Sequence, residues 1–290
     1  MHADPDADPP VDRVGIVGLG LIGGSIALGI RSAWPTVRVI GVDRPEVADA
    51  AARRGIIDDQ RGAALDLRDA DLIVLATPVA AIVDLVRELG GAGVTTTVTD
   101  VGSTKRRVMT AARTAGLVNF VAGHPMAGAA RGGLDAARDG LFAGRPWFLT
   151  AAAGASSGAR ARVERLVHAL GARAIATDPD EHDRVMAYVS HLPQLLAVAL
   201  MAAAGESVGE RGLAQAGRGL DDMTRLASSP PAVWESVFDS NADYVVEALR
   251  RLFSVLPPTV IDDPATLRDL FNRANDWRDR LERQRDAAQG

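Results

Sequence analysis

The feature that most constrains the fold is a glycine-rich turn at the end of the first apolar run of the chain. That run, at residues 14–17, is short and uncharged, which is typical of a parallel strand buried on both faces. It is followed directly by Gly18, Leu19, Gly20, Leu21, Ile22 and Gly23, and then by a helical pattern. In such a strand–turn–helix unit the first glycine permits the tight turn, the second lets a diphosphate approach the backbone, and the third lets the helix pack on the strand. The turn therefore predicts a dinucleotide-binding unit, with a glycine-rich turn of some other α/β protein as the alternative.

An acidic residue ends the second apolar run. Asp43 follows residues 37–42 and stands 20 residues after Gly23. A carboxylate at this place can accept hydrogen bonds from both hydroxyls of an adenosine ribose, and it repels a 2′-phosphate. The neighbouring Arg44 could stack on adenine or reach a 2′-phosphate. The pattern favours NAD and leaves NADP open, and a surface or capping role is the alternative for Asp43.

Apolar runs and helical patterns continue to alternate beyond this unit. Further strand-like runs stand at residues 72–76, 96–100, 118–122, 147–150 and 174–176, with helical patterns between them, as at 79–89. This rhythm predicts a parallel, doubly wound α/β sheet. Such sheets bind ligands at the carboxyl ends of their strands. Thr77 and Pro78 after one run, and Asp100 at the end of the next, are therefore predicted to line the cofactor site.

The pattern changes after Pro179, beyond which the periodicity is almost entirely helical. We therefore expect a disordered leader at residues 1–10, a Rossmann-type NAD(P)-binding domain at 11–178, and an all-α domain at 179–290. The chain ends in helix near Arg285 with no further βαββαβ pattern, so we expect no fused regulatory domain.

Composition excludes several classes of function. The chain has 290 residues, 47% of them hydrophobic, a net charge of -5 and no cysteine. Disulfides, thiolate nucleophiles and cysteine-ligated metals are therefore excluded, and no metal site is predicted. The acidic balance argues against binding to nucleic acid or to an anionic membrane. No apolar signal-like segment or uninterrupted apolar window of ~18 residues is seen, so we expect a cytoplasmic protein.

A set of polar residues carries the candidate chemistry. His124 stands between Gly123 and Pro125 after a strand-like run, and an imidazole can accept a proton near neutral pH. Arg225 offers a planar fork that suits a carboxylate. The other candidates are Ser103, His182, His191, Asp222 and Trp234. Ser103 could instead cap a helix, Trp234 and His182 could be core residues, and Arg225 could be a solvated surface residue.

Four stretches give these residues a common context. They are Asp-Val-Gly-Ser-Thr-Lys at 100–105, Gly-His-Pro-Met-Ala-Gly at 123–128, Glu-His-Asp-Arg at 181–184 running on to Ser-His-Leu-Pro at 190–193, and Asp-Met-Thr-Arg-Leu-Ala-Ser-Ser-Pro at 222–230 with Trp234 downstream. In this order they resemble the prephenate and arogenate dehydrogenases of tyrosine biosynthesis, over about residues 14–241. The resemblance implies a homodimer formed by the helical domain. It also implies oxidative decarboxylation of prephenate to 4-hydroxyphenylpyruvate, with hydride transfer to NAD.

The resemblance also implies a role for each candidate residue. His124 corresponds to the catalytic histidine, and Ser103 to a hydroxyl near the substrate hydroxyl and the nicotinamide. His191 corresponds to a substrate-binding histidine and Arg225 to the arginine that holds the ring carboxylate. Asp222 is expected to orient a neighbour, and Trp234 to line the site or the dimer contact.

One departure and three alternatives remain open at this point. Ala129 and Ala130 stand where many family members have a hydroxyl and then a polar residue, so prephenate and arogenate are not distinguished.

Another dehydrogenase, of the β-hydroxyacid or imine reductase type, would be expected to carry a lysine or aspartate on the helical domain. No lysine follows Lys105, which argues against the lysine version. A non-catalytic NAD-binding sensor would need neither His124 nor Arg225. Feedback by tyrosine, if it occurs, is expected at the active site.

Overall fold

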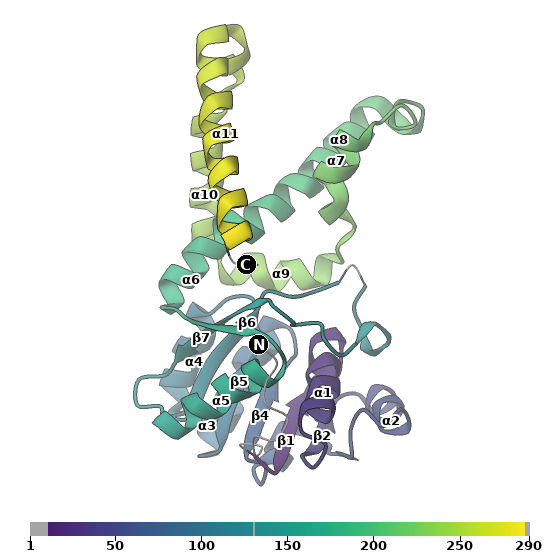
Figure 1. Ribbon diagram of the computed structural model, residues 1–290, viewed down its shortest axis with the longest axis vertical. Helices are drawn as coiled ribbons and strands as arrows, with labels where there is room; N and C mark the ends of the chain where they lie inside the picture. Colours follow the sequence, from purple (N-terminus) through teal and green to yellow (C-terminus); the bar gives the residue numbers. More distant parts are fainter. Residues whose placement is uncertain (1–10, 130, 288–290) are drawn as a thin grey trace. The chain divides into compact units, whose positions relative to one another are not determined.

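The computed structural model describes residues 11–129 and 131–287. The predicted leader at 1–10 and Ala130 lie outside the described residues. Within them, the strands form one eight-stranded sheet in the order β3-β2-β1-β4-β5-β6-β7-β8 (Figure 1). The strands are β1 (Arg13–Val17), β2 (Arg38–Val42), β3 (Asp59–Gln60), β4 (Leu72–Leu75), β5 (Thr97–Asp100), β6 (Phe120–Pro125), β7 (Pro146–Ala151) and β8 (Arg173–Ala176).

Helices cover both faces of this sheet, as the alternating pattern predicted. They are α1 (Leu21–Ala33), α2 (Pro45–Arg53), α3 (Val79–Gly91), α4 (Arg106–Ala115) and α5 (Ser157–Ala169). Successive side chains of β4 point to opposite faces. Leu72 and Val74 join the apolar cluster that includes α1 and α5, whereas Ile73 and Leu75 join the one that includes α3 and α4. Burial on both faces explains the continuous apolar strands, and the predicted Rossmann-type fold is confirmed.

The sheet is not parallel throughout, so the prediction of an all-parallel sheet is wrong for its last strands. β6 and β7 are antiparallel, with Val121 opposite Ala151 and Pro125 opposite Trp147, while β7 and β8 are parallel to each other. A parallel connection needs a crossover, usually a helix. The described part of the β6–β7 connection holds only a short 3₁₀ turn, η2 (Leu134–Ala136), so the chain turns back antiparallel.

Strand β6 also lies farther along the chain than predicted. The apolar run indicated residues 118–122, but the strand is Phe120–Pro125, because pairing with β7 extends it. His124 is therefore within the strand, opposite Phe148, rather than after it. The short strand β3 was not predicted, because its two polar residues carry no apolar signal and only pairing with β2 defines it.

The chain after β8 is helical, as predicted. It contains α6 (Pro179–Met186), α7 (Leu192–Leu213), α8 (Arg218–Thr224), α9 (Pro231–Ser240), α10 (Ala242–Val255) and α11 (Pro264–Ala287). A π-helical segment, Ala187–His191, joins α6 to α7. The N–H of Leu192 donates to the carbonyl of Ala187, five residues back, and Pro193 follows with no N–H to donate. The wider turn thus leaves His191 on a local distortion of the helix.

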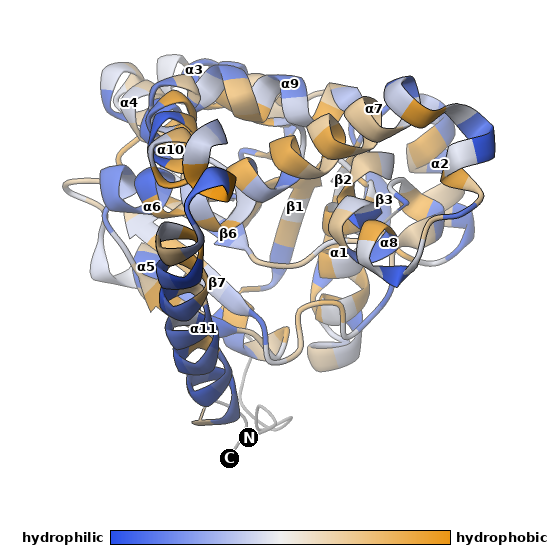
Figure 2. Ribbon diagram, turned by 90° about the horizontal axis from the view of Figure 1, so that it is seen from above, coloured by the Kyte–Doolittle hydropathy of each residue, from blue (hydrophilic) through white to orange (hydrophobic). Residues whose placement is uncertain are grey.

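The helical run Pro179–Leu213 is long and apolar enough to span a membrane by length and composition alone, with 33% of its most apolar window buried. α7 is rich in hydrophobic residues (Figure 2). The same run, however, carries His182, Asp183, His191 and Gln194, all of which are buried. Length and apolar composition alone are therefore weak evidence that this run crosses a membrane.

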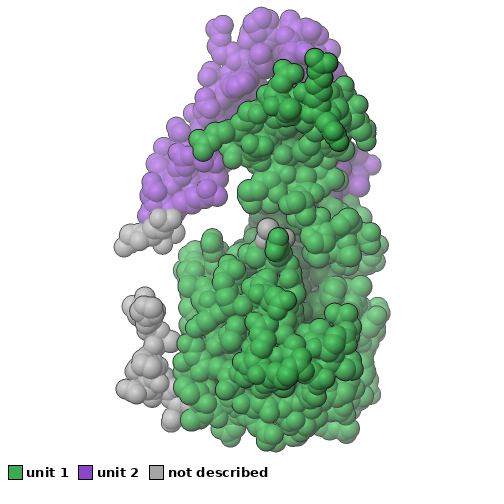
Figure 3. Space-filling model, turned by 90° about the vertical axis from the view of Figure 1, so that its right-hand side faces the viewer, with its two compact units in different colours: residues 1–242 green, residues 243–290 purple. Residues whose placement is uncertain are grey.

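The chain divides into two compact units, residues 1–242 and 243–290 (Figure 3). The first contains the sheet and the helices through α9. The second contains nearly all of α10, the 3₁₀ turn η5 (Pro258–Asp262) and α11. This division separates the parts of the chain that pack most closely within themselves. It does not test the predicted domain boundary at residue 178, which stays a prediction.

Candidate active site

The glycine turn between β1 and α1 has the backbone geometry of a dinucleotide-binding loop. Gly18 has φ +94°, and a Cβ there would lie 2.6 Å from the carbonyl oxygen of Ala76. A Cβ on Gly23 would overlap the carbonyl oxygen of Gly18, whereas one on Gly20 would meet nothing within 4 Å. Two of the glycines are thus required by packing, and the third borders open space.

The first turn of α1 is free to receive an anion. Gly20 is its N-cap and provides no side-chain cap, and the first turn holds no acidic residue. The leading N–H groups of a helix have no partners within the helix and attract phosphate. The residues present therefore fit the diphosphate of a dinucleotide.

Asp43 lies beside this turn at the end of β2. Its carboxylate accepts hydrogen bonds from the N–H of Leu19 at 2.6 Å and from the N–H of Arg44 at 2.7 Å. The Arg44 side chain is 75% exposed and forms an ion pair with Glu46 at 3.3 Å. Asp43 thus ties the end of β2 to the glycine turn, and its carboxylate oxygens still have lone pairs for ribose hydroxyls.

Thr77 and Pro78 follow β4, next to the glycine turn. A Cβ on Gly18 would lie 3.0 Å from Cγ2 of Thr77, so the two loops pack against each other. The Thr77 hydroxyl is buried and has no hydrogen-bond partner among the described residues. Such an orphaned polar atom fits a place where a ligand supplies the missing partner.

Asp100 is placed differently from its predicted role at the cofactor. Its buried carboxylate accepts hydrogen bonds from Nζ of Lys105 at 2.6 Å, from the N–H of Gly102 at 2.8 Å and from the N–H of Gly123 at 3.1 Å. Nζ of Lys105 also donates to the carbonyl of Gly123 at 2.6 Å. This buried ion pair holds the end of β5 against the residue that precedes His124. Lys105, the only lysine of the chain, lies in a stretch that the sequence singled out, but its contact with Asp100 and Gly123 was not predicted.

His124 begins a chain of hydrogen-bonded buried side chains. Its Nδ1 lies 2.9 Å from Nε2 of His182, and Nδ1 of His182 lies 2.8 Å from Oδ1 of Asp183. Phe148 packs edge-on against His182. Burial, and then the neighbouring His182, Lys105 and His191, lower the pKa of His124 well below its usual 6.5. A neutral imidazole of this kind can accept a proton.

Asp183 also caps helix α4 from a distance. Its carboxylate accepts hydrogen bonds from the N–H of Lys105 at 2.7 Å and from the N–H of Arg106 at 2.9 Å. Burial by itself raises the pKa of Asp183, but the hydrogen bonds from His182 and from these two amides outweigh it, and the pKa is lowered. The charged carboxylate, on α6, thus binds two amides at the start of α4 that lie 78 and 77 positions earlier in the chain.

His191 occupies the π-helical segment and is buried. Its Nδ1 lies 3.1 Å from Nδ2 of Asn241, and its ring packs edge-on against Trp234 and Phe238. Burial is the main cause that lowers the pKa of His191 to about 4. Nε2 of His191 is buried and has no partner among the described residues. Two separately predicted residues, His191 and Trp234, are thus brought together, and Asn241 joins them without having been predicted.

Ser103 lies in the turn between β5 and α4 and is half-buried. It makes no hydrogen bond to any described residue. The N-cap of α4 is Lys105, with no side-chain cap, so the alternative that Ser103 caps this helix is wrong. The hydroxyl of the adjacent Thr104, by contrast, forms a hydrogen bond with the hydroxyl of Ser240 at 2.9 Å.

Arg225 and Asp222 are exposed, and within the described residues neither forms an ion pair. The segment that carries Arg225 is nevertheless anchored beside His191. Nε2 of Gln194, on the first turn of α7, donates to the carbonyl of Leu226 at 2.9 Å. This contact joins the segment of Arg225 to the first turn of α7, three residues after His191, while the predicted roles of Arg225 and Asp222 stay predictions.

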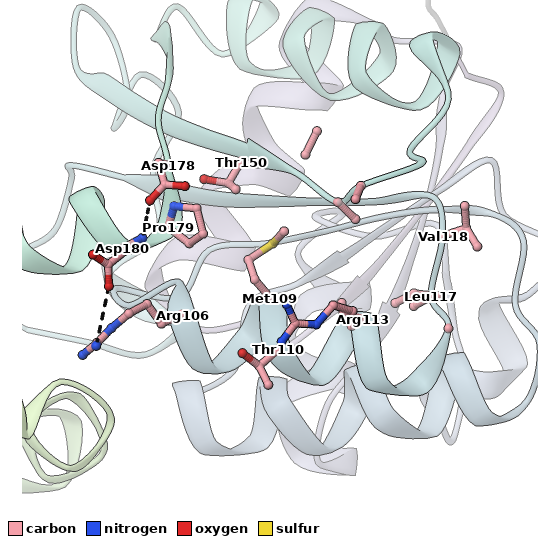
Figure 4. Close-up of a pocket in the computed structure, with 15 residues that line it drawn as sticks. Arg106, Met109, Thr110, Arg113, Leu117, Val118, Thr150, Asp178, Pro179 and Asp180 are labelled. Atoms are coloured by element: carbon pink, nitrogen blue, oxygen red, sulfur yellow. Dashed lines mark hydrogen bonds and ion pairs between the residues drawn. The ribbon is translucent and has the colours of Figure 1, made fainter.

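Figure 4 shows a cavity of about 500 Å³ whose lining includes none of the buried histidines. It runs along α4 and the beginning of α6, and its walls include Met109, Arg113 and Asp178. None of the predicted site residues lines it. Arg106 connects it to the cluster, because this arginine lies 3.8 Å from Asp180 and 3.5 Å from Asp183. Among the described residues no group of three or more His, Asp or Glu side chains is placed to hold a metal ion.

Comparisons with known proteins place this geometry in a family. Residues 26–176 match the family model of the prephenate dehydrogenase nucleotide-binding domain, and residues 178–255 match that of the prephenate dehydrogenase dimerization domain. The prephenate dehydrogenase of Bacillus subtilis is 34% identical over 282 residues, which cover 93% of this chain and 76% of that protein.

Solved structures agree. Prephenate dehydrogenase of Aquifex aeolicus, in complex with hydroxyphenyl propionate and NAD+, superposes with a TM-score of 0.82 at 27% identity, covering 95% of this chain and 98% of that one. Arogenate dehydrogenase of Synechocystis superposes with a TM-score of 0.77 at 27% identity, covering 93% and 99%. The family predicted from the motifs is therefore confirmed. The chain belongs to the prephenate dehydrogenase family.

Proposed function

We propose that this chain is an NAD-dependent prephenate dehydrogenase, which converts prephenate to 4-hydroxyphenylpyruvate and CO2. The observation that carries the proposal is the buried chain His124–His182–Asp183 at the carboxyl end of β6. It supplies a neutral, oriented imidazole at the edge of the sheet where the glycine turn also lies. Membership in the prephenate dehydrogenase family supports the choice of substrate.

The reaction requires a proton acceptor and an anchor for a carboxylate. NAD, which the glycine turn and Asp43 would hold, would supply the hydride acceptor for C4 of the substrate. His124 takes the proton of the 4-hydroxyl, so that a ring ketone forms. Loss of CO2 from the ring carboxylate sends its electron pair through the ring to that oxygen, and the proton held by His124 then completes the phenol. Protons, electrons and charge balance without a further reactant.

The remaining residues position the substrate in this proposal. Arg225 pairs with the ring carboxylate, because a guanidinium fork matches a planar carboxylate. His191 offers a polar atom that has no protein partner among the described residues. Ser103, with no hydrogen bond to described residues, is available to the 4-hydroxyl. Asp222 orients a neighbouring group, and Trp234 forms an apolar wall next to His191.

The cofactor preference follows from Asp43. Its carboxylate, held beside the glycine turn, would face the 2′ position of the adenosine ribose, which favours NAD over NADP. The neighbouring Arg44 is engaged with Glu46, which reduces its availability for a 2′-phosphate. The Aquifex aeolicus relative was solved with NAD+.

We further propose that the protein is a cytoplasmic homodimer that acts on a small molecule, and that it binds neither nucleic acid nor membranes. The match to a dimerization-domain model supports the dimer. So do the exposed apolar side chains on the helices, among them Val198, Val208, Met223 and Val246. The net charge of -5 supports the absence of nucleic-acid and anionic-membrane binding.

Arogenate is the second candidate substrate. It is favoured by the likeness to the Synechocystis arogenate dehydrogenase. Ala129 provides no polar side chain where many family members carry one, and Ala130 lies outside the described residues. The two substrates differ only in a keto or an amino group on the side chain, so this position bears on the choice.

Initial rates with prephenate or arogenate and with NAD or NADP, four combinations in all, test the proposal. The highest kcat/KM is expected for prephenate with NAD. A preference for arogenate would change the substrate, and a preference for NADP would mean that Arg44 outweighs Asp43. No turnover in any combination would favour a non-catalytic NAD-binding protein.

The role of His124 is tested by His124→Asn. We expect roughly a 10²–10⁴-fold loss of kcat, the usual contribution of a positioned acid–base group. The Kd for NAD, measured by calorimetry, should barely change, because His124 does not belong to the glycine turn. Wild-type turnover by this variant would remove His124 from the mechanism.

A further inference from the structure

We propose that Asp183, Asn241 and His182 hold His124 and His191 in opposite tautomers. His124 presents a lone pair at Nε2, and His191 presents an N–H at Nε2. His182, Asp183 and Asn241 are then positioning residues that act through the two histidines. The roles of these residues in catalysis rest on the proposed function, whereas the tautomers of His124 and His191 can be measured whether or not the protein has that function.

The tautomer of His124 follows from the carboxylate at the far end of its chain. Asp183 is charged and can only accept, so Nδ1 of His182, at 2.8 Å, must donate to it. In neutral His182 the other nitrogen, Nε2, is then an acceptor. It lies 2.9 Å from Nδ1 of His124, which must therefore carry the hydrogen. The lone pair of neutral His124 is left on Nε2, which makes no hydrogen bond within the described residues.

The tautomer of His191 follows from the orientation of one amide. Nη2 of Arg106 donates to Oδ1 of Asn241 at 3.1 Å, and Nδ2 of Asn241 donates to the backbone carbonyl of Asp183 at 2.7 Å. These two contacts determine which end of the amide carries the hydrogens. Nδ2 therefore also donates to Nδ1 of His191, at 3.1 Å. Nδ1 is the acceptor, and the hydrogen of neutral His191 is on Nε2, the buried atom for which the described residues provide no partner.

Both arrangements depend on the same residue. The carboxylate of Asp183 orients His182, and its backbone carbonyl orients Asn241. Asn241 is fully buried, so water does not compete for its amide. A single buried network thus prepares one acceptor and one donor.

The two tautomers meet opposite needs of the reaction. A lone pair on His124 Nε2 can receive the proton of the substrate hydroxyl, and a hydrogen on His191 Nε2 can bind an anionic or carbonyl oxygen of the substrate. If the tautomers were exchanged, His124 could not accept the proton. Asp183 also lies where it stabilises positive charge that develops on the His124–His182 pair.

Long-range ¹H–¹⁵N NMR spectra of the ligand-free protein test the proposal directly. The two-bond couplings of a neutral imidazole show which nitrogen carries the hydrogen, and the chain has only five histidines to assign. At pH 7.5 we expect the Nδ1–H form for His124 and the Nε2–H form for His191. Observation of the same tautomer in both residues, or of the exchanged pair, would overturn the proposal.

Two variants with different chemistry extend the test. Asn241→Asp replaces the donating Nδ2 with an acceptor, so the hydrogen of His191 should move to Nδ1 and KM should rise at least tenfold. The matched control is Asn119→Asp, because the Asn119 amide also joins two backbone groups, of Thr95 and Ser156, but on another loop. An unchanged His191 spectrum in folded Asn241→Asp would contradict the assigned role. Should that variant not fold, the wild-type spectrum still decides.

His182 is tested by a pair of substitutions. His182→Gln keeps an acceptor that can receive the Nδ1 hydrogen of His124, whereas His182→Leu removes it. We expect His182→Leu to lose at least tenfold in kcat and His182→Gln to recover most of that loss, with KM little changed in both. Equal kcat in the two variants would show that His182 does not act through His124. If the predicted tautomers are found in a protein that does not oxidise prephenate or arogenate, the proposed function fails and the tautomer assignment stands.

Discussion

Burial determines the charge state of the site at the scale of single residues. It lowers the pKa of His191 to about 4 and that of His124 well below 6.5, so both rings are neutral at pH 7. A neutral ring can both accept and donate one hydrogen bond, which is why its tautomer matters. The arginine predicted to hold the substrate carboxylate is, by contrast, exposed and without an ion pair among the described residues.

The neutral state of His191 predicts how stability depends on pH. An unfolded chain protonates this histidine near pH 6.5 but the folded chain only near pH 4, so the unfolded state binds more protons between these values. The free energy of unfolding should therefore fall as the pH drops from 6.5 to 4, by up to about 1.4 kcal/mol per pH unit from this group. His191→Gln should lose that component, as measured by urea unfolding at several pH values. The exposed His168→Gln is the control, and an equal pH dependence in wild type and His191→Gln would refute this reasoning.

Arg225→Ala should raise the KM for prephenate strongly without changing stability. If the bound substrate desolvates the pair that Arg225 forms with its carboxylate, truncation of Arg225 costs ~2–5 kcal/mol. Arg225→Lys should recover only part, because a point charge does not reproduce the fork. Steady-state kinetics with the exposed Arg218→Ala as control provide the measurement. Wild-type KM in Arg225→Ala would identify Arg225 as a surface residue, and Arg131 would be the next anchor to test.

At the scale of elements, two local arrangements place the histidines. The antiparallel pairing of β6 with β7 extends β6 as far as Pro125, so His124 is held by strand hydrogen bonds rather than by a loop. The π-helical segment before α7 places His191 on a widened turn, two residues before Pro193, which has no N–H to donate. Asp183 then connects the helical segment to the sheet domain by capping α4.

The glycine turn allows cofactor binding to be separated from folding. A Cβ on Gly20 meets no atom within 4 Å, whereas a Cβ on Gly23 overlaps the carbonyl of Gly18. Gly20→Ala should therefore keep the wild-type Tm but weaken NAD binding at least tenfold. Gly23→Ala should lower the free energy of unfolding, by ~1–3 kcal/mol or more, as other overpacked sites do. Thermal unfolding and calorimetry measure the two effects, and wild-type NAD affinity in Gly20→Ala would show that the diphosphate does not approach this glycine.

At the scale of the whole molecule, several helices expose apolar side chains, which we expect to pack against the surface of another protein chain. Val198, Val208 and Met223 are 42%, 54% and 64% exposed, and a dimerization-domain model matches residues 178–255. Clusters of such side chains commonly mark interfaces between proteins. A second copy of the chain would cover them.

Assembly is tested by light scattering at micromolar concentration. The wild-type protein should have the mass of a dimer, and Val198→Asp should weaken the dimer toward a mass near 30.4 kDa. The control is Val118→Asp, which places the same charge on an exposed valine of the sheet domain and should leave the dimer intact. A monomeric wild type, or equal effects of the two variants, would contradict dimerisation through the helices.

Much of the fold and part of the site are encoded locally and could be predicted from the sequence. The glycine turn, Asp43 and the alternation of apolar strands with helices follow from requirements within about 30 residues, such as backbone conformation, phosphate approach and burial on two faces. His124, His191 and Arg225 were found because each stands in a contiguous motif. The family predicted from these motifs is confirmed by the comparisons.

The tertiary structure alone decided the rest, because those features depend on residues far apart in the chain. His124 contacts His182 from 58 positions away, and Asn241 contacts His191 from 50 positions away. The sequence names His182 as a candidate, but no local pattern shows that it contacts His124, nor that Asp183 binds the amides at the start of α4. The same reason applies to the antiparallel β7, whose direction depends on pairing with β6 and on a connection whose described part has no crossover helix, rather than on its own residues. Local sequence determines which side chains can perform the chemistry, and long-range packing determines which of their atoms carry the hydrogens.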